Sequence, residues 1–166
     1  QTFWGIHAGA TGDAHSLFHN HDCIALGWEA FGDLSKLPPN RDGFKAEYNR
    51  LYPGEKPMNV AVSAGQLFRF VYEMRPGDLV IYPSKIDKLI HIGRVTGPYE
   101  YNPALSSAYP HRRVVDWLKD VPRTQLSQGA LYEIGSAMSL FQVKNYADEW
   151  LAVLQGSQSV APPPDE

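Results

Sequence analysis

Several features are scarce in this chain of 166 residues. It has one cysteine, Cys23, so it can form no internal disulfide, and a single thiol is typical of proteins in a reducing compartment. No apolar run approaches about 18 residues, the length that crosses a bilayer as a helix. We therefore expect a cytoplasmic protein that has no membrane partner.

Neither sign of charge is in large excess, because 15 Lys and Arg residues face 18 Asp and Glu residues, for a net charge of -3. A strongly electrostatic nucleic-acid binder is basic overall, so any binding of this kind must depend on a local basic patch. The hydrophobic share of 43% is enough for a real core in one domain, which we place at residues 1–155.

The end of the sequence differs in composition from the rest. Residues 156–166 include Pro162, Pro163 and Pro164 and are predicted to form a Pro-rich tail or linker. The chain also begins at Gln1 rather than Met. We expect a fragment of a longer protein, with a further domain downstream of this linker.

Motifs for catalysis are also lacking. No paired-carboxylate or nuclease motif is present, and Gly9-Ala10-Thr11-Gly12 is followed by no lysine of a phosphate-binding loop. We therefore predict no catalytic residue and no cofactor.

One cluster could suit a metal, and its members are His15, His19, His21, Asp22 and Cys23. On a helix, His15 and His19 would share a face, as zinc ligands can. No glutamate sits between them in the protease pattern, and no second ligand group follows at a matching spacing. We predict no metal site, and a small metal-dependent enzyme built on this cluster is kept as an alternative.

The most informative stretch runs from Met74 to Val95. Pro76-Gly77-Asp78 is typical of a turn, because Pro presets φ at one corner and Gly tolerates positive φ at the next. Leu79–Tyr82 and Leu89–Val95 read as paired strands, and Gly93 marks a bulge or close contact. The hairpin tip carries Tyr82, Ser84, Lys85 and Lys88.

Hydrophobic spacing predicts the other elements. Helices are expected at Ala14–Asn20, Asp42–Tyr52, Val60–Met74 and Tyr146–Leu154, and strands at Thr2–His7, Cys23–Trp28, Arg113–Leu118 and Ser139–Val143. Ser127–Ile134 fits a short helix or a loop, Tyr99–Pro110 a loop, and Val121-Pro122-Arg123 a turn. Short strands around a few helices indicate an α+β fold with a strongly bent sheet or a small open barrel.

Four stretches in this order resemble a known family: Phe3-Trp4-Gly5-Ile6-His7, Gly27-Trp28, Pro76 to Ser84 with Ile92 to Val95, and Phe141-Gln142-Val143 before a helix with Trp150. Over residues 2–154 the chain resembles the EVE and YTH domains of the PUA-like superfamily. It resembles more closely the N-terminal domain of Mrr-type, modification-dependent restriction proteins. The resemblance implies a reader domain that flips a methylated or hydroxymethylated DNA base into an aromatic cage and is fused to a nuclease.

The resemblance also nominates base-binding residues. Trp28 is the leading cage wall, other walls could come from Tyr82, Tyr99, Tyr101 and Trp117, and polar edge contacts from His7, Gln66 and Ser84. Each has a structural alternative, since large aromatics in a small domain usually belong to the core. We assign Trp4, Trp117 and Trp150 to the core first.

Phosphate contacts are assigned to the cations near these elements, namely Arg69, Lys85, Lys88, Arg112 and Arg113. Such contacts would fix register without reading sequence, and the alternative is an ordinary solvated surface. A PUA-like module that reads modified RNA is a second possible function, because composition does not separate the two. The sequence also leaves open which modified base is bound.

Overall fold

The computed structural model describes residues 1–156, and its centre is one mixed sheet of six strands in the order β2-β5-β4-β3-β1-β6. The strands are β1 (Phe3–Ile6), β2 (Cys23–Leu26), β3 (Leu79–Pro83), β4 (Leu89–Tyr101), β5 (His111–Pro122) and β6 (Leu140–Gln142). The pair β1–β3 is parallel, and the other neighbouring pairs are antiparallel. The predicted tail beyond Gly156 lies outside the described residues.

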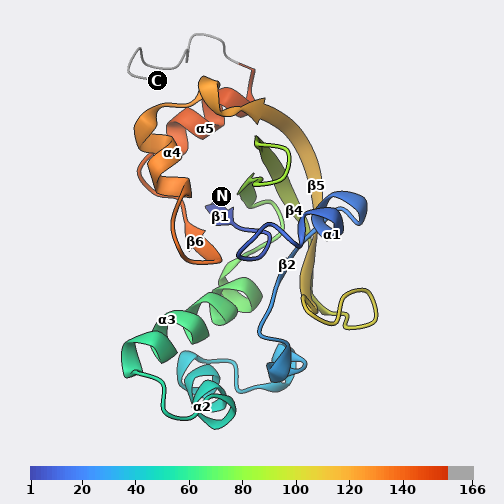
Figure 1. Ribbon diagram of the computed structural model, residues 1–166, viewed down its shortest axis with the longest axis vertical. Coiled ribbons are helices and arrows are strands. Elements are labelled where there is room, and N and C mark those ends of the chain that lie inside the picture. The colour runs from blue at the N-terminus through green and yellow to red at the C-terminus, as the bar shows by residue number, and fades with distance from the viewer. Residues whose placement is uncertain (157–166) are drawn as a thin grey trace.

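Five α-helices surround the sheet within residues 1–156: α1 (His15–Asn20), α2 (Arg41–Leu51), α3 (Pro57–Phe68), α4 (Gln128–Ile134) and α5 (Ala147–Leu154). A π-helical turn, Arg69–Glu73, continues α3. In Figure 1, α2 and α3 lie at one end of the molecule, α4 and α5 lie at the other, and the curved β5 runs along one side. The expected α+β class, with a bent sheet flanked by helices, agrees with this architecture.

The predicted turn before β3 is confirmed, and the side chain of its last residue, Asp78, links β3 to β1. The carbonyl oxygen of Arg75 accepts from the Asp78 N–H at 3.0 Å, and Gly77 has φ of 97°, as a type II turn requires. The buried Asp78 carboxylate also accepts from Trp4 Nε1 at 3.0 Å and from the Thr2 N–H at 3.1 Å. This carboxylate therefore fixes β1 beside β3.

The irregularity predicted at Gly93 is also confirmed. The register between β4 and β5 shifts between Ile92 and Gly93. A Cβ atom at position 93 would lie 2.8 Å from Cε3 of Trp117, so only glycine lets this ring approach the strand.

Two apolar clusters form the core. One joins the sheet to α1, α2 and α3 and contains Trp4, Phe18, Phe44 and Phe70. The other lies beneath α4 and α5 and contains Trp150. The core assignment is confirmed for Trp4 and Trp150, which are 2% and 0% exposed, whereas Trp117 is only partly buried against the first cluster.

The strands β4 and β5 are longer than predicted. Tyr99–Tyr101 continue β4 by pairing with His111–Arg113, so the predicted loop shortens to residues 102–110. Val121 and Pro122 belong to β5 rather than to a turn, because they pair with Ile90 and Leu89. Cross-strand pairing of this kind overrides the local turn preference of Asn and Pro.

The hairpin tip is only partly exposed. Lys85 and Lys88 are exposed, but Tyr82 and Ser84 are only 2% and 7% exposed. No helix within residues 1–156 combines the length and apolar character needed to cross a bilayer.

Candidate functional site

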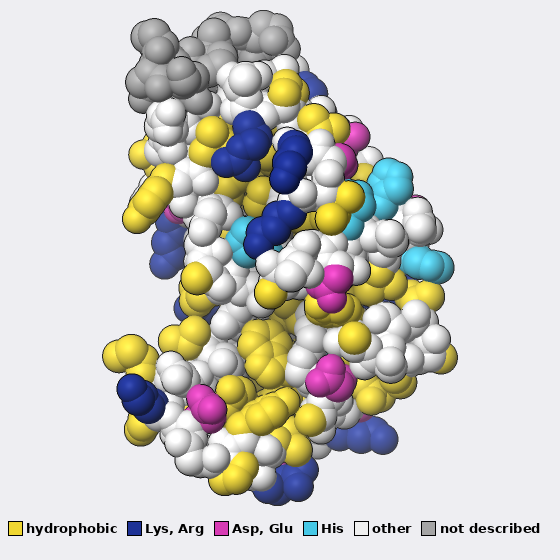
Figure 2. Space-filling model, viewed as in Figure 1, with side chains coloured by type: hydrophobic (Ala, Val, Ile, Leu, Met, Phe, Trp, Pro, Cys, Tyr) yellow, Lys and Arg dark blue, Asp and Glu magenta, His cyan; other side chains and the backbone are white. Residues whose placement is uncertain are grey.

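A cavity of about 620 Å³ opens between the end of β1, the β3–β4 turn and the segment after α4. Its volume is within the ~300–1,000 Å³ range of small-ligand sites. Figure 2 shows Lys and Arg side chains gathered around a hollow on the upper part of this face, next to a histidine. We call it the basic cavity, and its lining is His7, Gly9, Ala10, Pro83, Ser84, Lys85, Lys88, Arg123, Leu131, Ile134 and residues 135–139.

Three cations line this cavity: Lys85, Lys88 and Arg123. Lys85 Nζ donates to the carbonyl oxygen of Ala10 at 2.6 Å. Within residues 1–156, no carboxylate lies within ion-pair distance of any of the three. Their charge is therefore available to an anion.

His7 contributes an imidazole ring to the basic cavity from the end of β1. Its Nε2 lies 2.8 Å from the carbonyl oxygen of Ser136, which can only accept, so Nε2 carries the hydrogen. Burial lowers the pKa of His7 below 6.5; the Ser136 bond opposes this shift and the charge of Lys85 adds to it. The ring is neutral at pH 7.

Gln66 and Ser84 accept hydrogen bonds from the backbone of two segments at the basic cavity. Gln66 is buried on α3, and its Oε1 accepts from the N–H groups of Ser139 and Leu140 at 2.8 and 3.1 Å. Ser84 Oγ accepts from the N–H groups of Ile86 and Asp87 at 3.0 and 3.2 Å. Gln66 therefore holds the wall formed by residues 135–139, and Ser84 holds the turn that carries Lys85 and Lys88.

Two of the predicted cage aromatics lie elsewhere. Tyr82 and Trp117 line a second pocket, of about 300 Å³, beside α1. The Tyr82 hydroxyl bonds to Nδ1 of His15 at 2.7 Å, and Trp117 Nε1 donates to the carbonyl oxygen of Phe18 at 3.0 Å. Their polar atoms already have protein partners.

The remaining aromatics surround His111. The Tyr99 hydroxyl bonds to Nδ1 of His111 at 2.8 Å, and Nε2 of His111 donates to the carbonyl oxygen of Trp28 at 3.2 Å. The Tyr101 ring centroid lies 5.7 Å from that of His111. Burial lowers the pKa of His111, partly offset by the bond to Trp28 and the charge of Asp33.

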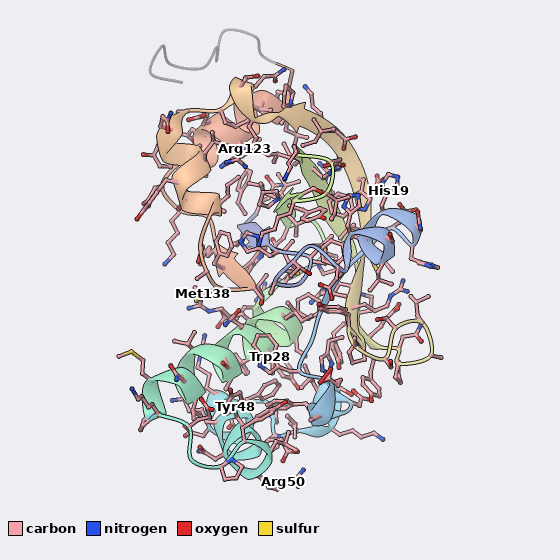
Figure 3. All side chains as sticks on the ribbon, viewed as in Figure 1. His19, Trp28, Tyr48, Arg50, Arg123 and Met138 are labelled. Atoms are coloured by element: carbon pink, nitrogen blue, oxygen red, sulfur yellow. The ribbon has the colours of Figure 1, made fainter. Side chains whose placement is uncertain are left out.

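Trp28 has a left-handed backbone, with φ of 55°. This conformation costs a non-glycine residue on the order of 1–3 kcal/mol. Its side chain is half-buried against the first core cluster, and Figure 3 places it between the basic cavity's end of the molecule and α2. The proposed base-binding residues are thus spread over three places, and among residues 1–156 no Phe, Tyr or Trp lines the basic cavity.

Only some of the cations assigned to phosphate contacts lie at the basic cavity. Lys85 and Lys88 reach the basic cavity, while Arg69 and Arg112 lie 3.7 and 3.2 Å from Glu73 and Glu100. The assignment of Arg113 to a phosphate contact is wrong, because this residue is only 2% exposed.

The Arg113 guanidinium donates to three backbone carbonyls, those of Phe70 and Met74 at 2.9 Å and that of Gly97 at 3.2 Å. Burial lowers its pKa. It holds the π-helical turn to the sheet and does not face solvent.

Sequence reasoning missed Arg123. It is exposed and begins a 3-10 turn, Arg123–Gln125, directly after β5. Figure 3 shows it on the same face as Met138, which also lines the basic cavity. Its one sequence signal is a cation at the end of a strand, which does not predict that it lies near Lys85.

The histidine cluster around α1 forms no metal centre in the described part of the chain, where no three His, Cys, Asp or Glu side chains are arranged to hold an ion. The rings of His15 and His19 stack with centroids 6.0 Å apart. Cys23 is fully buried, and burial raises the pKa of its thiol to about 11.

Sequence reasoning also missed His91. Its Nε2 and Nδ1 each lie 2.7 Å from a carboxylate oxygen, of Asp87 and Asp120 respectively. The ring therefore bridges the two carboxylates. It links the β3–β4 turn to β5 beneath the second pocket.

Comparisons with known proteins bear on the family and on the fold. The model of a family described as "Domain of unknown function (DUF8426)" matches residues 4–144. No curated protein matches the sequence.

Similar solved structures include the YTH domain of the Zygosaccharomyces rouxii MRB1 protein in complex with N6-methyladenosine RNA. It is 12% identical with a TM-score of 0.46, covering 95% of this chain and 85% of that one. A Rhodopseudomonas palustris protein is 13% identical with a TM-score of 0.40, covering 93% and 92%. A Pseudomonas syringae protein is 13% identical with a TM-score of 0.42, covering 93% and 99%.

Proposed function

This chain belongs to the family described as a domain of unknown function, DUF8426, and we propose that it is a reader domain that takes one modified base of DNA into the basic cavity. In this proposal the base is methylated or hydroxymethylated and is flipped out of the duplex. The domain selects the site, and a separate nuclease domain fused to it cuts the strand.

One observation carries the proposal: a base-sized cavity is lined by cations that have no carboxylate partner in residues 1–156. A flipped nucleotide presents a phosphate and a planar base within a few ångströms of each other. Lys85, Lys88 and Arg123 suit the phosphate, because such contacts fix position without reading sequence. This basic patch is local, as the net charge of -3 requires.

The inner wall of the basic cavity suits a methyl group. Pro83, Leu131, Ile134 and Met138 line it, and burial of one methyl group contributes about 0.8 kcal/mol. Flipping costs a few kcal/mol, so phosphate contacts and hydrogen bonds to the base edge must supply most of the binding free energy. The methyl contact then supplies the preference for the modified base.

The reader role is tested by the affinity of the chain for otherwise identical DNA duplexes. One carries no modification, and the others carry a single 5-methylcytosine, 5-hydroxymethylcytosine or N6-methyladenine. Fluorescence anisotropy measures Kd, and 2-aminopurine opposite the target base reports flipping. One modification should bind several-fold more tightly than plain DNA and increase 2-aminopurine fluorescence. Equal affinity for all the duplexes would refute the proposal.

Matched RNA oligonucleotides form the second arm of this experiment. The cations and the cavity admit a ribonucleotide as well, so tighter binding of modified RNA than of modified DNA would favour the RNA-reading alternative. A nuclease assay with Mg²⁺ forms the third arm, in which the chain alone should leave DNA intact. Nicking that is lost on His15→Ala or His19→Ala would favour the metal-dependent enzyme instead.

A further inference from the structure

We infer that His7 is a specificity-determining residue, whose Nδ1 accepts a hydrogen bond from an exocyclic amino group of the base in the basic cavity. The inference rests on the proposed function and narrows its substrate class to bases that carry an exocyclic amino group, which excludes thymine-type bases.

The geometry of His7 fixes which of its nitrogens can meet a ligand. Nε2 lies 2.8 Å from the carbonyl oxygen of Ser136 and must donate to it. In the neutral ring the hydrogen is therefore on Nε2, and Nδ1 is a bare acceptor. Within residues 1–156 no donor is bonded to Nδ1, and the ring lines the basic cavity.

The groups that face His7 favour this neutral form. The cavity brings Lys85 and Lys88 from the β3–β4 turn and Arg123 from the end of β5, all positively charged. On the remaining sides, Ser136 presents its carbonyl oxygen and Phe141 of β6 presents a ring whose centroid lies 5.7 Å from that of His7. Among the described residues no carboxylate lines the cavity, so no negatively charged side chain there stabilises an imidazolium.

Because Nδ1 of His7 is an acceptor among cations, different side chains would bind the phosphate and the base. A phosphate offers only acceptor oxygens, so it pairs with Lys85, Lys88 or Arg123 and not with Nδ1 of His7. Cytosine offers an N4 amino group and adenine an N6 amino group, whereas thymine offers a carbonyl oxygen at the same position. N6-methyladenine and 5-methylcytosine both keep at least one N–H on that group, so His7 can read either.

The test removes the amino group from the base without changing its shape. Duplexes carry either the amino-bearing base or its analogue without the exocyclic amine. The pairs are 5-methylcytosine with 5-methylpyrimidin-2-one, and unmodified adenine with purine, because the methyl group of N6-methyladenine is attached to the amine itself. The wild-type chain should bind the analogue about fivefold to tenfold more weakly, as expected for one lost hydrogen bond. An equal affinity for base and analogue would overturn the inference.

Two substitutions separate reading from positioning. His7→Gln places an amide N–H where Nε2 lies, so the Ser136 bond can persist, but it offers no acceptor at Nδ1. It should bind base and analogue equally. His7→Asn places an amide oxygen near Nδ1 and should restore part of the discrimination. A discrimination in His7→Gln equal to that of the wild type would assign the amine to another residue.

The pH profile provides a readout that a structural role would not change. Because the pKa of His7 lies below 6.5, acidification past it adds a hydrogen to Nδ1 and turns the acceptor into a donor. Affinity for the amino-bearing base should therefore fall with acidification, and His7→Gln should lack this fall. If protonation instead strengthens binding, His7 is a phosphate ligand. If the wild-type chain shows no preference for modified over plain DNA, the reader function itself is refuted. If it keeps that preference but binds the base and its amine-free analogue equally, only this inference is refuted.

Discussion

The side-chain oxygen Oε1 of Gln66 accepts a hydrogen bond from the backbone N–H of Ser139 at 2.8 Å. A second bond, from the N–H of Leu140, reaches the same oxygen at 3.1 Å. This buried amide joins α3, in the helical end of the molecule, to the wall of the basic cavity. The position of the wall therefore depends on the packing of α3 against the sheet.

Replacing Gln66 should loosen this wall. Gln66→Met keeps the size of the side chain but leaves two backbone N–H groups without an acceptor, which costs about 1–3 kcal/mol for each buried group. Urea denaturation should show the loss, and amide exchange at Ser139 and Leu140 should accelerate. Gln142→Met, on the exposed face of β6, is the matched control. Equal stability of the two variants would contradict the role of Gln66.

The cavity cations should contribute charge rather than sequence preference. Lys85→Gln, Lys88→Gln and Arg123→Gln should each weaken binding of modified and plain DNA alike. Each should reduce the slope of log K against log salt by about 0.9 if that cation pairs with one phosphate. Arg50→Gln is the control, because Arg50 pairs with Glu47 on α2 and lies at the opposite end of the molecule (Figure 3). A slope that matches this control would remove the cation from the interface.

Arg113 and Arg112 are neighbours with different expected effects on stability. Arg113→Met removes the donor of three backbone carbonyls, so the free energy of unfolding should fall by about 3 kcal/mol or more. Arg112→Met breaks one ion pair with a partly exposed Glu100, which is worth at most about 1 kcal/mol. Urea denaturation of both variants measures the difference. Similar losses would show that the buried contacts of Arg113 are not the stabilising ones.

Two substitutions of Trp28 separate the contribution of its ring from the strain of its left-handed backbone. Trp28 is not among the residues that line the basic cavity, so we expect Trp28→Ala to keep the preference for modified DNA while the domain stays folded. Trp28→Gly should keep the preference as well but be more stable than Trp28→Ala by about 1 kcal/mol, because glycine tolerates φ of 55°. Unfolding of both variants would make Trp28 a core residue. Loss of the preference in folded variants would place the base against Trp28 and contradict the basic cavity as its site.

Local residue preferences in the sequence were sufficient to predict many of the secondary-structure elements. The turn Pro76-Gly77-Asp78 and the close contact at Gly93 follow from backbone preferences that act over a few residues. Helices α2 and α3 follow from apolar spacing, although α3 is completed by a π-helical turn rather than by regular helix. The extension of β4 and β5 was not predictable in this way, because the pairing of Tyr99 with Arg113 joins distant segments.

The sequence by itself determined the α+β class, the main turns and the presence of cations near a hairpin, because each depends on neighbours along the chain. Only the tertiary structure decided the site. Its strand order, β2-β5-β4-β3-β1-β6, brings His7, Lys85 and Arg123 to one cavity. The same packing buries Arg113 beneath the π-helical turn while its neighbour Arg112 reaches Glu100. Whether a side chain faces a cavity, the core or solvent depends on long-range strand pairing, which no local pattern encodes.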